Sequence, residues 1–196
     1  MEALFNGKRV QEHWNSVISS IDKEIHRLPK SSFTNSTIDE LTAELIHKYS
    51  INIPQLLEEE IYMKKPEDVR IAADRRSVYG PTVEGTKFTF VVPFKGDSLF
   101  FNILPSRQQN LFPSAKISGN ELLMIIQVPL GSNTSNIREE IDKNIDRIKT
   151  YLSLLDNDAK IFRNGLQSAI RGSLQNRKRK LDNDDEVANS FGFPVR

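Results

Sequence analysis

The chain has 196 residues, of which 38% are hydrophobic, with 27 lysine and arginine residues against 26 aspartate and glutamate residues. This length suits one domain or two small ones, and a formal net charge of +1 gives no overall field that would attract a polyanion. The absence of cysteine excludes disulfides, thiolate metal sites and a cysteine nucleophile. Neither a secretory signal nor a run of about 18 apolar residues occurs, so we expect a cytoplasmic protein without membrane association.

The N-terminal part has the periodicity of helices. Apolar side chains at steps of three and four predict an amphipathic helix over residues 8–28. The polar stretch 30–36 is expected to be a loop. Thr37 and Glu40 have the spacing of a capping box, which predicts a second helix that ends before Pro54.

The middle of the chain changes to short runs rich in β-branched and aromatic residues. These runs predict strands over 60–64, 69–73, 86–92, 98–104, 115–117 and 122–128. Glycines beside short polar residues predict hairpin turns at 94–98 and 117–121, so the sheet should be mainly antiparallel. The last of these strands is apolar on both faces and should be central. In the predicted strand over 86–92, the alternation places Phe88, Phe90 and Val92 on a buried face, opposite a face that is more exposed to solvent.

Helical periodicity then returns. Ile137, Ile141, Ile145 and Ile148 form one stripe of a predicted helix, and a second helical face follows the polar segment 156–158. We expect these two helices to pair as an antiparallel hairpin. Because the hairpin holds more apolar surface than one small sheet face needs, the isoleucine stripe is a candidate surface for a protein partner or for self-association. The alternative is that the first two helices cover the stripe within the monomer.

Together these patterns predict a single α+β module. Its mainly antiparallel sheet of about five or six strands should be flanked by two N-terminal helices and two long C-terminal helices. The expected parts are helical over 1–54, sheet over 55–131, a helical hairpin over 132–183 and a tail over 184–196. The apolar ending after Ser190 is unusual for a chain terminus, which favours a fragment of a longer protein.

The residues offer little support for catalytic or cofactor chemistry. Residues 80–87 contain the glycines of a phosphate-binding loop, but the lysine comes one residue late and a strand follows, which favours a turn. The three histidines are too far apart for a metal pair and are better explained as solvated helix residues. Asp74 and Lys87 come nearest to a metal-dependent nuclease, but an acid-x-lysine triplet does not follow. We therefore expect no cofactor and no metal.

One concentrated basic segment stands near the end of the last predicted helix. The candidate contacts to phosphate or to an acidic partner are Arg171, Arg177, Lys178, Arg179 and Lys180. Cations are also common in the last turn of a helix, where they oppose the macrodipole, and acidic residues follow at once. A solvated helix end is therefore favoured, and we expect nucleic acid to bind weakly at most.

Short motifs in the second half of the chain carry a resemblance to a known group of proteins. They are Pro93-Phe94-x-Gly96, Phe162-Arg163-Asn164-x-Leu166, the basic helix end and Gly192-Phe193-Pro194. In these motifs the chain resembles uncharacterised N-terminal modules of multidomain bacterial antiphage defence proteins. The resemblance implies a non-catalytic interaction, sensing or assembly module ahead of an effector domain, and it carries over no catalytic residue. A metal-dependent hydrolase or nuclease is the first alternative, and a nucleic-acid-binding module is the second.

Overall fold

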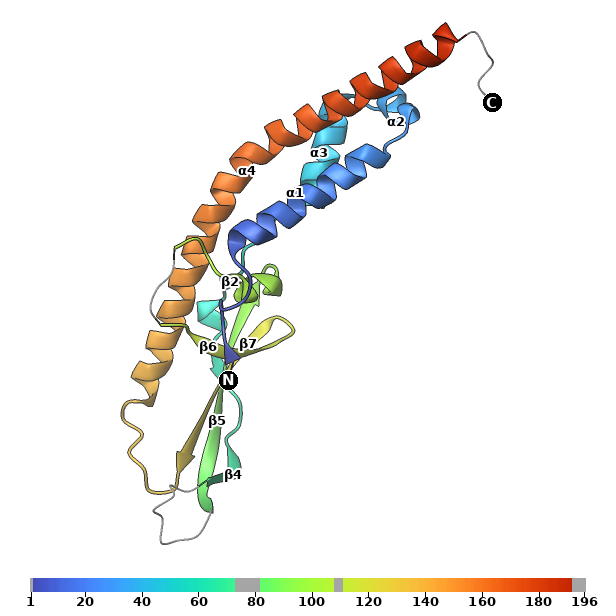
Figure 1. The fold of residues 1–196 in the computed structure, drawn as a ribbon. Helices are drawn as coiled ribbons and strands as arrows, with labels where there is room; N and C mark the ends of the chain where they lie inside the picture. The colour runs from blue at the N-terminus through green and yellow to red at the C-terminus, as the bar shows by residue number, and fades with distance from the viewer. Residues whose placement is uncertain (1, 73–81, 108–110, 192–196) are drawn as a thin grey trace. The chain divides into compact units, whose positions relative to one another are not determined.

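The structure is a computed structural model that describes residues 2–72, 82–107 and 111–191 (Figure 1). The chain divides into two compact units. The first comprises Met1–Val10 and Asn52–Asp156, and the second comprises Gln11–Ile51 and Asn157–Arg196. The predicted α+β class with an antiparallel sheet is confirmed.

The first unit contains a seven-stranded sheet in which all neighbouring strands are antiparallel. Its strands are β1 (Glu2–Ala3), β2 (Gln55–Leu56), β3 (Tyr62–Met63), β4 (Glu67–Ala72), β5 (Thr82–Lys95), β6 (Ser114–Ser118) and β7 (Glu121–Pro129). Along the order β1-β6-β7-β5-β2, strand β7 lies between two neighbours, which confirms its predicted central place. Strand β5 is the longest, and β2, β3 and β4 pair with it in succession.

One face of this sheet packs against the first part of helix α4 (Ile137–Ser190). Asn144 on α4 donates hydrogen bonds to the Ser114 carbonyl (2.8 Å) and to Met124 Sδ (3.4 Å). Met124 shares its face with Phe90, its register partner on β5, and is fully buried. The same helix face places Ile148 in the core.

The N-terminal segment runs into the core of the first unit. The Leu4 amide donates to the Pro113 carbonyl (2.8 Å), and the side chains of Leu4 and Phe5 are both buried. The Phe5 ring stacks on Tyr151 with 4.8 Å between centroids, and Phe94 and Phe101 meet edge to face. This aromatic contact ties the start of the chain to α4.

Two sequence predictions for the sheet were wrong. Residues 98–104 are not a strand, because Ser98–Asn102 form the short 3₁₀ helix η2, which starts where the Asp97 carboxylate accepts a hydrogen bond from the Leu99 amide. The predicted hairpin at 94–98 is also absent. At Gly96 the backbone takes φ +109°, and the Asp97 amide then donates to the Asn52 carbonyl instead of returning along β5.

Other predictions for the sheet need smaller corrections. The hairpin at 117–121 is confirmed, with Gly119 at φ +57° between β6 and β7. The predicted strand over 60–64 is reduced to β3, after the 3₁₀ helix η1 (Glu58–Glu60). The prediction of a more exposed face on β5 was wrong at Thr89 and Val91, which are buried. Val92, on the opposite face, is buried as well, so both faces of β5 are covered at this point of the strand.

The second unit is helical and contains α1 (Val10–Arg27), α2 (Lys30–Asn35), α3 (Ile38–Lys48) and the second part of α4. Its buried core consists of Ile21, Ile25, Leu41, Leu45, Leu166, Ile170 and Leu174. The Trp14 ring stacks on Phe162 at 4.6 Å. The capping box is confirmed, since Glu40 donates its amide to Thr37 Oγ1 and accepts the Thr37 amide.

Residues 30–36 are not a loop. They form α2, where the Ser36 amide donates to the Ser32 carbonyl. Pro29 stands at the N-cap with φ −76°, a value compatible with entry into a helix, and its own carbonyl accepts the Ser32 amide. Pro29 therefore ends α1 and also begins a new short helix, which the polar composition of residues 30–36 did not predict.

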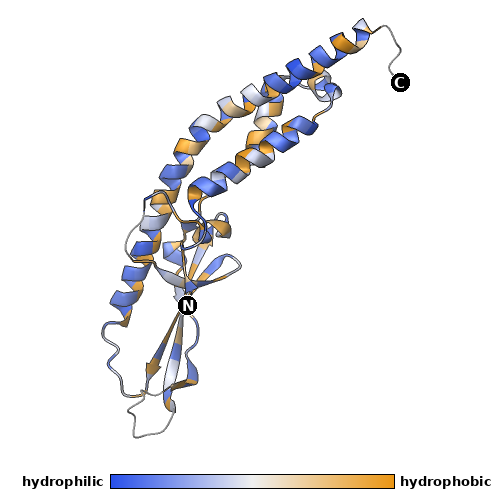
Figure 2. Ribbon diagram, in the orientation of Figure 1, coloured by the Kyte–Doolittle hydropathy of each residue, from blue (hydrophilic) through white to orange (hydrophobic). Residues whose placement is uncertain are grey.

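The predicted helical hairpin over 132–183 was wrong, because α4 is one helix of 54 residues. Asp156, Asn157 and Asp158 lie inside it; these residues are weak helix formers but do not break a helix as proline does. Leu155 and Ala159 are both buried on either side of them, which continues the apolar face across the predicted turn. The helix also occupies most of the predicted tail, to Ser190, and residues 192–196 lie outside the described part. Figure 2 shows apolar and polar residues alternating along the whole of α4.

Candidate functional site

The basic segment does not form a free cationic patch in the structure. Arg171 pairs with Asp39 of α3 at 2.8 Å, and the Arg177 guanidinium donates two hydrogen bonds to the Leu28 carbonyl at 3.0 and 3.2 Å. Lys180 pairs with Asp184 at 2.6 Å. Arg179 donates to the Asn176 side chain, and Lys178 is exposed. Most of these cations therefore bind groups within the second unit, and Arg177 satisfies a backbone carbonyl just after α1 ends.

A polar cluster joins α1 to the end of α3. Lys48 Nζ lies 2.7 Å from both carboxylate oxygens of Glu24, and the Tyr49 hydroxyl donates to the same carboxylate at 2.9 Å. The hydrogen bond from Lys48 lowers the pKa of Glu24 and, in return, raises the pKa of Lys48. Burial and the hydrogen bond to Glu24 raise the pKa of Tyr49. The cluster is a structural connection between two helices.

Several polar groups that line the cavities of the second unit already have partners within it. One of about 350 Å³ lies between α1 and α4, where Ser173 donates to Asp22 at 3.1 Å beside the Arg177 contact. Another of about 230 Å³ is bounded by Tyr49 and by Arg163, which donates to the Ile51 carbonyl at 2.9 Å. These polar groups stabilise the helical unit.

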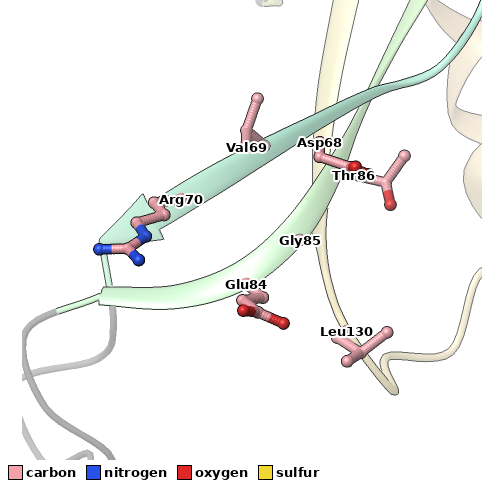
Figure 3. Close-up of a pocket in the computed structure, with 7 residues that line it drawn as sticks. All are labelled: Asp68, Val69, Arg70, Glu84, Gly85, Thr86 and Leu130. Atoms are coloured by element: carbon pink, nitrogen blue, oxygen red, sulfur yellow. The ribbon is translucent and has the colours of Figure 1, made fainter.

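A cavity of about 390 Å³ lies where β4, β5 and the end of β7 run together (Figure 3). It is lined by Asp68, Val69, Arg70, Glu84, Gly85, Thr86 and Leu130. Asp68 is the register partner of Thr86, and Arg70 is the partner of Glu84. Figure 3 shows the Arg70 guanidinium extending away from Glu84, and Leu130 is 80% exposed. This face of the strands is open and carries both signs of charge.

The opposite face of β4 packs partly against β5. Glu67 pairs there with Lys87 at 2.8 Å. Ile71 covers Gly85 so closely that a Cβ at this glycine would lie 2.3 Å from Ile71 Cδ1. Strand β4 is therefore anchored to β5 by one set of side chains, while the alternate set, Asp68 and Arg70, is exposed.

The hydrogen bonds of β5 show which backbone groups of β4 point toward β5 and which point away from it, along the outer edge. The carbonyl of Glu84 and the amide of Phe94 bond toward the β7 side, whereas the carbonyls of Thr89 and Pro93 bond toward the side of β2 and β3. Odd-numbered residues of β5 therefore face β4, and their register partners on β4 are Glu67, Val69 and Ile71. The backbone groups of Asp68, Arg70 and Ala72 consequently point outward. In the ranges that the structure describes, β5 is the sole strand that pairs with β4.

Other sequence-predicted sites are not assembled as expected. Residues 82–87 of the phosphate-loop candidate lie within β5, so residues 82–85 are strand and not the turn that the sequence favoured, and residues 80 and 81 lie outside the described part. Asp74 is also outside it, and Lys87 is occupied by Glu67. Across the described residues, no three His, Cys, Asp or Glu side chains gather closely enough to hold a metal ion. None of the described helices has the length and apolar character needed to cross a membrane.

The isoleucine stripe of α4 is not the exposed surface that the partner hypothesis required. Ile141, Ile145 and Ile148 are buried within the chain, and Ile137 is half-buried. The physical reason is that α4 is the helix that packs on the sheet of the first unit, so its apolar face is used there. The edge of β4 was missed, although the alternation of charged and apolar residues in 67–72 is a signal of a strand with one exposed face.

Comparison with known proteins gave no matching family model, no matching curated protein and no matching solved structure.

Proposed function

We propose that the chain is a non-catalytic assembly module that binds protein by adding a strand to the outer edge of β4. The observation that carries the proposal is the outward direction of the Asp68, Arg70 and Ala72 backbone groups on a strand whose other edge is paired. Such an edge is a template for an incoming strand, whose main-chain hydrogen bonds supply affinity.

The surroundings of the edge support this role. The face of the sheet that carries Asp68 and Arg70 is open, with a cavity of about 390 Å³ over β4 and β5 and with Leu130 exposed on the β7 side of β5. The resemblance of the short motifs to N-terminal modules of antiphage defence proteins favours a place for this module ahead of a cytoplasmic effector domain. The internal pairing of Arg171 and Arg177 makes nucleic-acid binding a weaker explanation of the chain.

The experiment compares two proline substitutions on adjacent residues of β4. Arg70→Pro removes an outward amide and should lower the free energy of unfolding by no more than about 1 kcal/mol, since edge strands tolerate proline at such positions. Val69→Pro removes a hydrogen bond to β5 and should cost about 3 kcal/mol or more. Chemical denaturation of both variants checks the assigned direction of the edge.

Sedimentation velocity over a wide concentration range then tests assembly. The wild-type chain should depart reversibly from its monomer mass of 22.4 kDa as concentration rises, and folded Arg70→Pro should remain monomeric. Equal losses of stability in Val69→Pro and Arg70→Pro would contradict the outward direction of the edge, and with it the proposed function.

A further inference from the structure

The two exposed charges of β4 are opposite in sign and stand at alternate positions, Asp68 and Arg70. We infer that the strand that adds to β4 is β4 of a second copy of this chain, antiparallel to the first, with a twofold axis through Val69. This inference rests on the proposed function, because it names the partner of the same edge.

The register follows from which backbone groups point outward. With the axis at Val69, Asp68 lies opposite Arg70 of the second copy, and the twofold axis repeats the pair. Both residues direct their N–H and C=O groups outward, so they form a hydrogen-bonded pair with Cα atoms about 5.5 Å apart. Their side chains lie on the same face, where opposite charges across two strands are stabilising.

The neighbouring registers are less favourable. An axis at Arg70 places this cation opposite its own copy, and an axis at Asp68 opposes two carboxylates. Like charges directly across a strand pair are destabilising. An axis through Glu67 also sets a carboxylate against its own copy. The charges of the strand therefore select the axis at Val69 over these three.

The geometry around the strand fits this arrangement. Val69 would meet its own copy on the face opposite the charges. Asp68 and Arg70 are exposed on the face of β4 that borders the cavity of about 390 Å³, so both side chains can reach a partner across the edge. Pro66, just before the strand, would lie opposite Ala72 of the second copy, where its carbonyl can still accept a hydrogen bond. Because the contact is isologous, it closes on two chains instead of propagating into a fibre.

Charge reversal tests the register directly. Asp68→Arg and Arg70→Asp should each weaken self-association by about tenfold or more, since every cross-strand pair becomes repulsive. An equimolar mixture of the two variants should associate again, because each copy then carries charges of one sign that meet the opposite sign. The double variant Asp68→Arg/Arg70→Asp should associate by itself. Sedimentation velocity of each sample gives the dissociation constants.

Two matched controls make the same changes of charge on exposed residues of the second unit. Glu44→Arg on α3 and Lys23→Asp on α1 should leave the dissociation constant within about twofold of wild type. Single reversals without effect, or a mixture that associates no better than its components, would overturn the inference. If Arg70→Pro abolishes association while the reversals do not change it, the edge remains the assembly surface and the second-copy register is wrong. A wild-type monomer at all concentrations would likewise overturn the inference of a second copy, whereas equal losses of stability in Val69→Pro and Arg70→Pro would reject the proposed function itself.

Discussion

At the scale of the residue, the surroundings of two glycines, Gly96 and Gly165, decide whether a larger side chain would be tolerated. Gly96 has φ +109°, and a Cβ there would lie 2.9 Å from both the Ile53 carbonyl oxygen and Pro54 Cα. The left-handed backbone and the close approach of another segment both require glycine. Gly165 lies within α4, and a Cβ there would meet no atom within 4 Å. A glycine inside a helix that needs neither a left-handed backbone nor a close contact lowers the stability of the helix.

Opposite effects of alanine are therefore expected at these two glycines. Gly96→Ala should lower the free energy of unfolding by about 1–3 kcal/mol, because the added methyl meets backbone atoms in a strained conformation. Gly165→Ala should raise it by about 0.5–1 kcal/mol. Urea denaturation followed by circular dichroism measures both changes, and the same sign for the two variants would contradict the assigned environments.

At the scale of the element, α4 combines very different environments in one helix. Ile170 is 1% exposed in the core of the second unit, whereas Ile161 is 74% exposed on the same helix. The helix therefore has one apolar face that packs against the core, and Ile161 lies outside that face.

Truncating each of these isoleucines should separate packing from helix propensity. Ile170→Ala should cost about 2–4 kcal/mol, since it removes buried methylene groups and leaves a cavity. Ile161→Ala should change stability by no more than about 0.5 kcal/mol. Thermal unfolding of the two variants under one buffer provides the comparison. A large loss at Ile161 would show that this side chain is covered by something outside the chain.

At the scale of the whole molecule, charge pairing makes stability depend on pH. The hydrogen bond from Lys48 lowers the pKa of Glu24 below its ordinary 4.5, and the Thr37 backbone amide lowers the pKa of Glu40 in the same direction. A carboxylate whose pKa is lowered on folding stabilises the protein above its unfolded pKa. This contribution is lost as the pH falls through the folded pKa.

The helical unit should consequently lose stability as the pH falls from about 5 to about 3. Glu24→Gln should lower stability at neutral pH and reduce this dependence, because the glutamine has no charge to lose. Glu44→Gln, at an exposed acid of α3, serves as the matched control and should keep the wild-type profile. Unfolding followed by the fluorescence of Trp14, which stacks within the same unit, measures the effect. Identical pH profiles for Glu24→Gln and the control would show that the Glu24 carboxylate does not contribute to the pH dependence of stability.

Some features of this protein could be derived from a few residues at a time. The helical face of α1 and the Thr37–Glu40 box depend on residues within one or two turns, and the structure confirms both. The β6–β7 hairpin depends on a glycine between two strands, and it is also confirmed. Two ambiguous local signals were interpreted wrongly. The segment 156–158 was predicted as a turn but continues α4, and the apolar stretch after Asp97 was predicted as a strand but forms η2.

Neighbours in the sequence were thus sufficient for the α+β class, the antiparallel sheet and the start of α3, because hydrogen bonds and periodicity act over a few residues. Which surfaces are buried, paired or exposed could be learned only from the tertiary structure. The isoleucine stripe of α4 is covered by the sheet, and Arg177 is bonded to the carbonyl of Leu28. Among the described residues, β4 pairs only with β5, on one of its two edges. Burial and strand pairing depend on segments far apart in the chain, and the pattern of residues within one segment does not specify which distant segment will meet it.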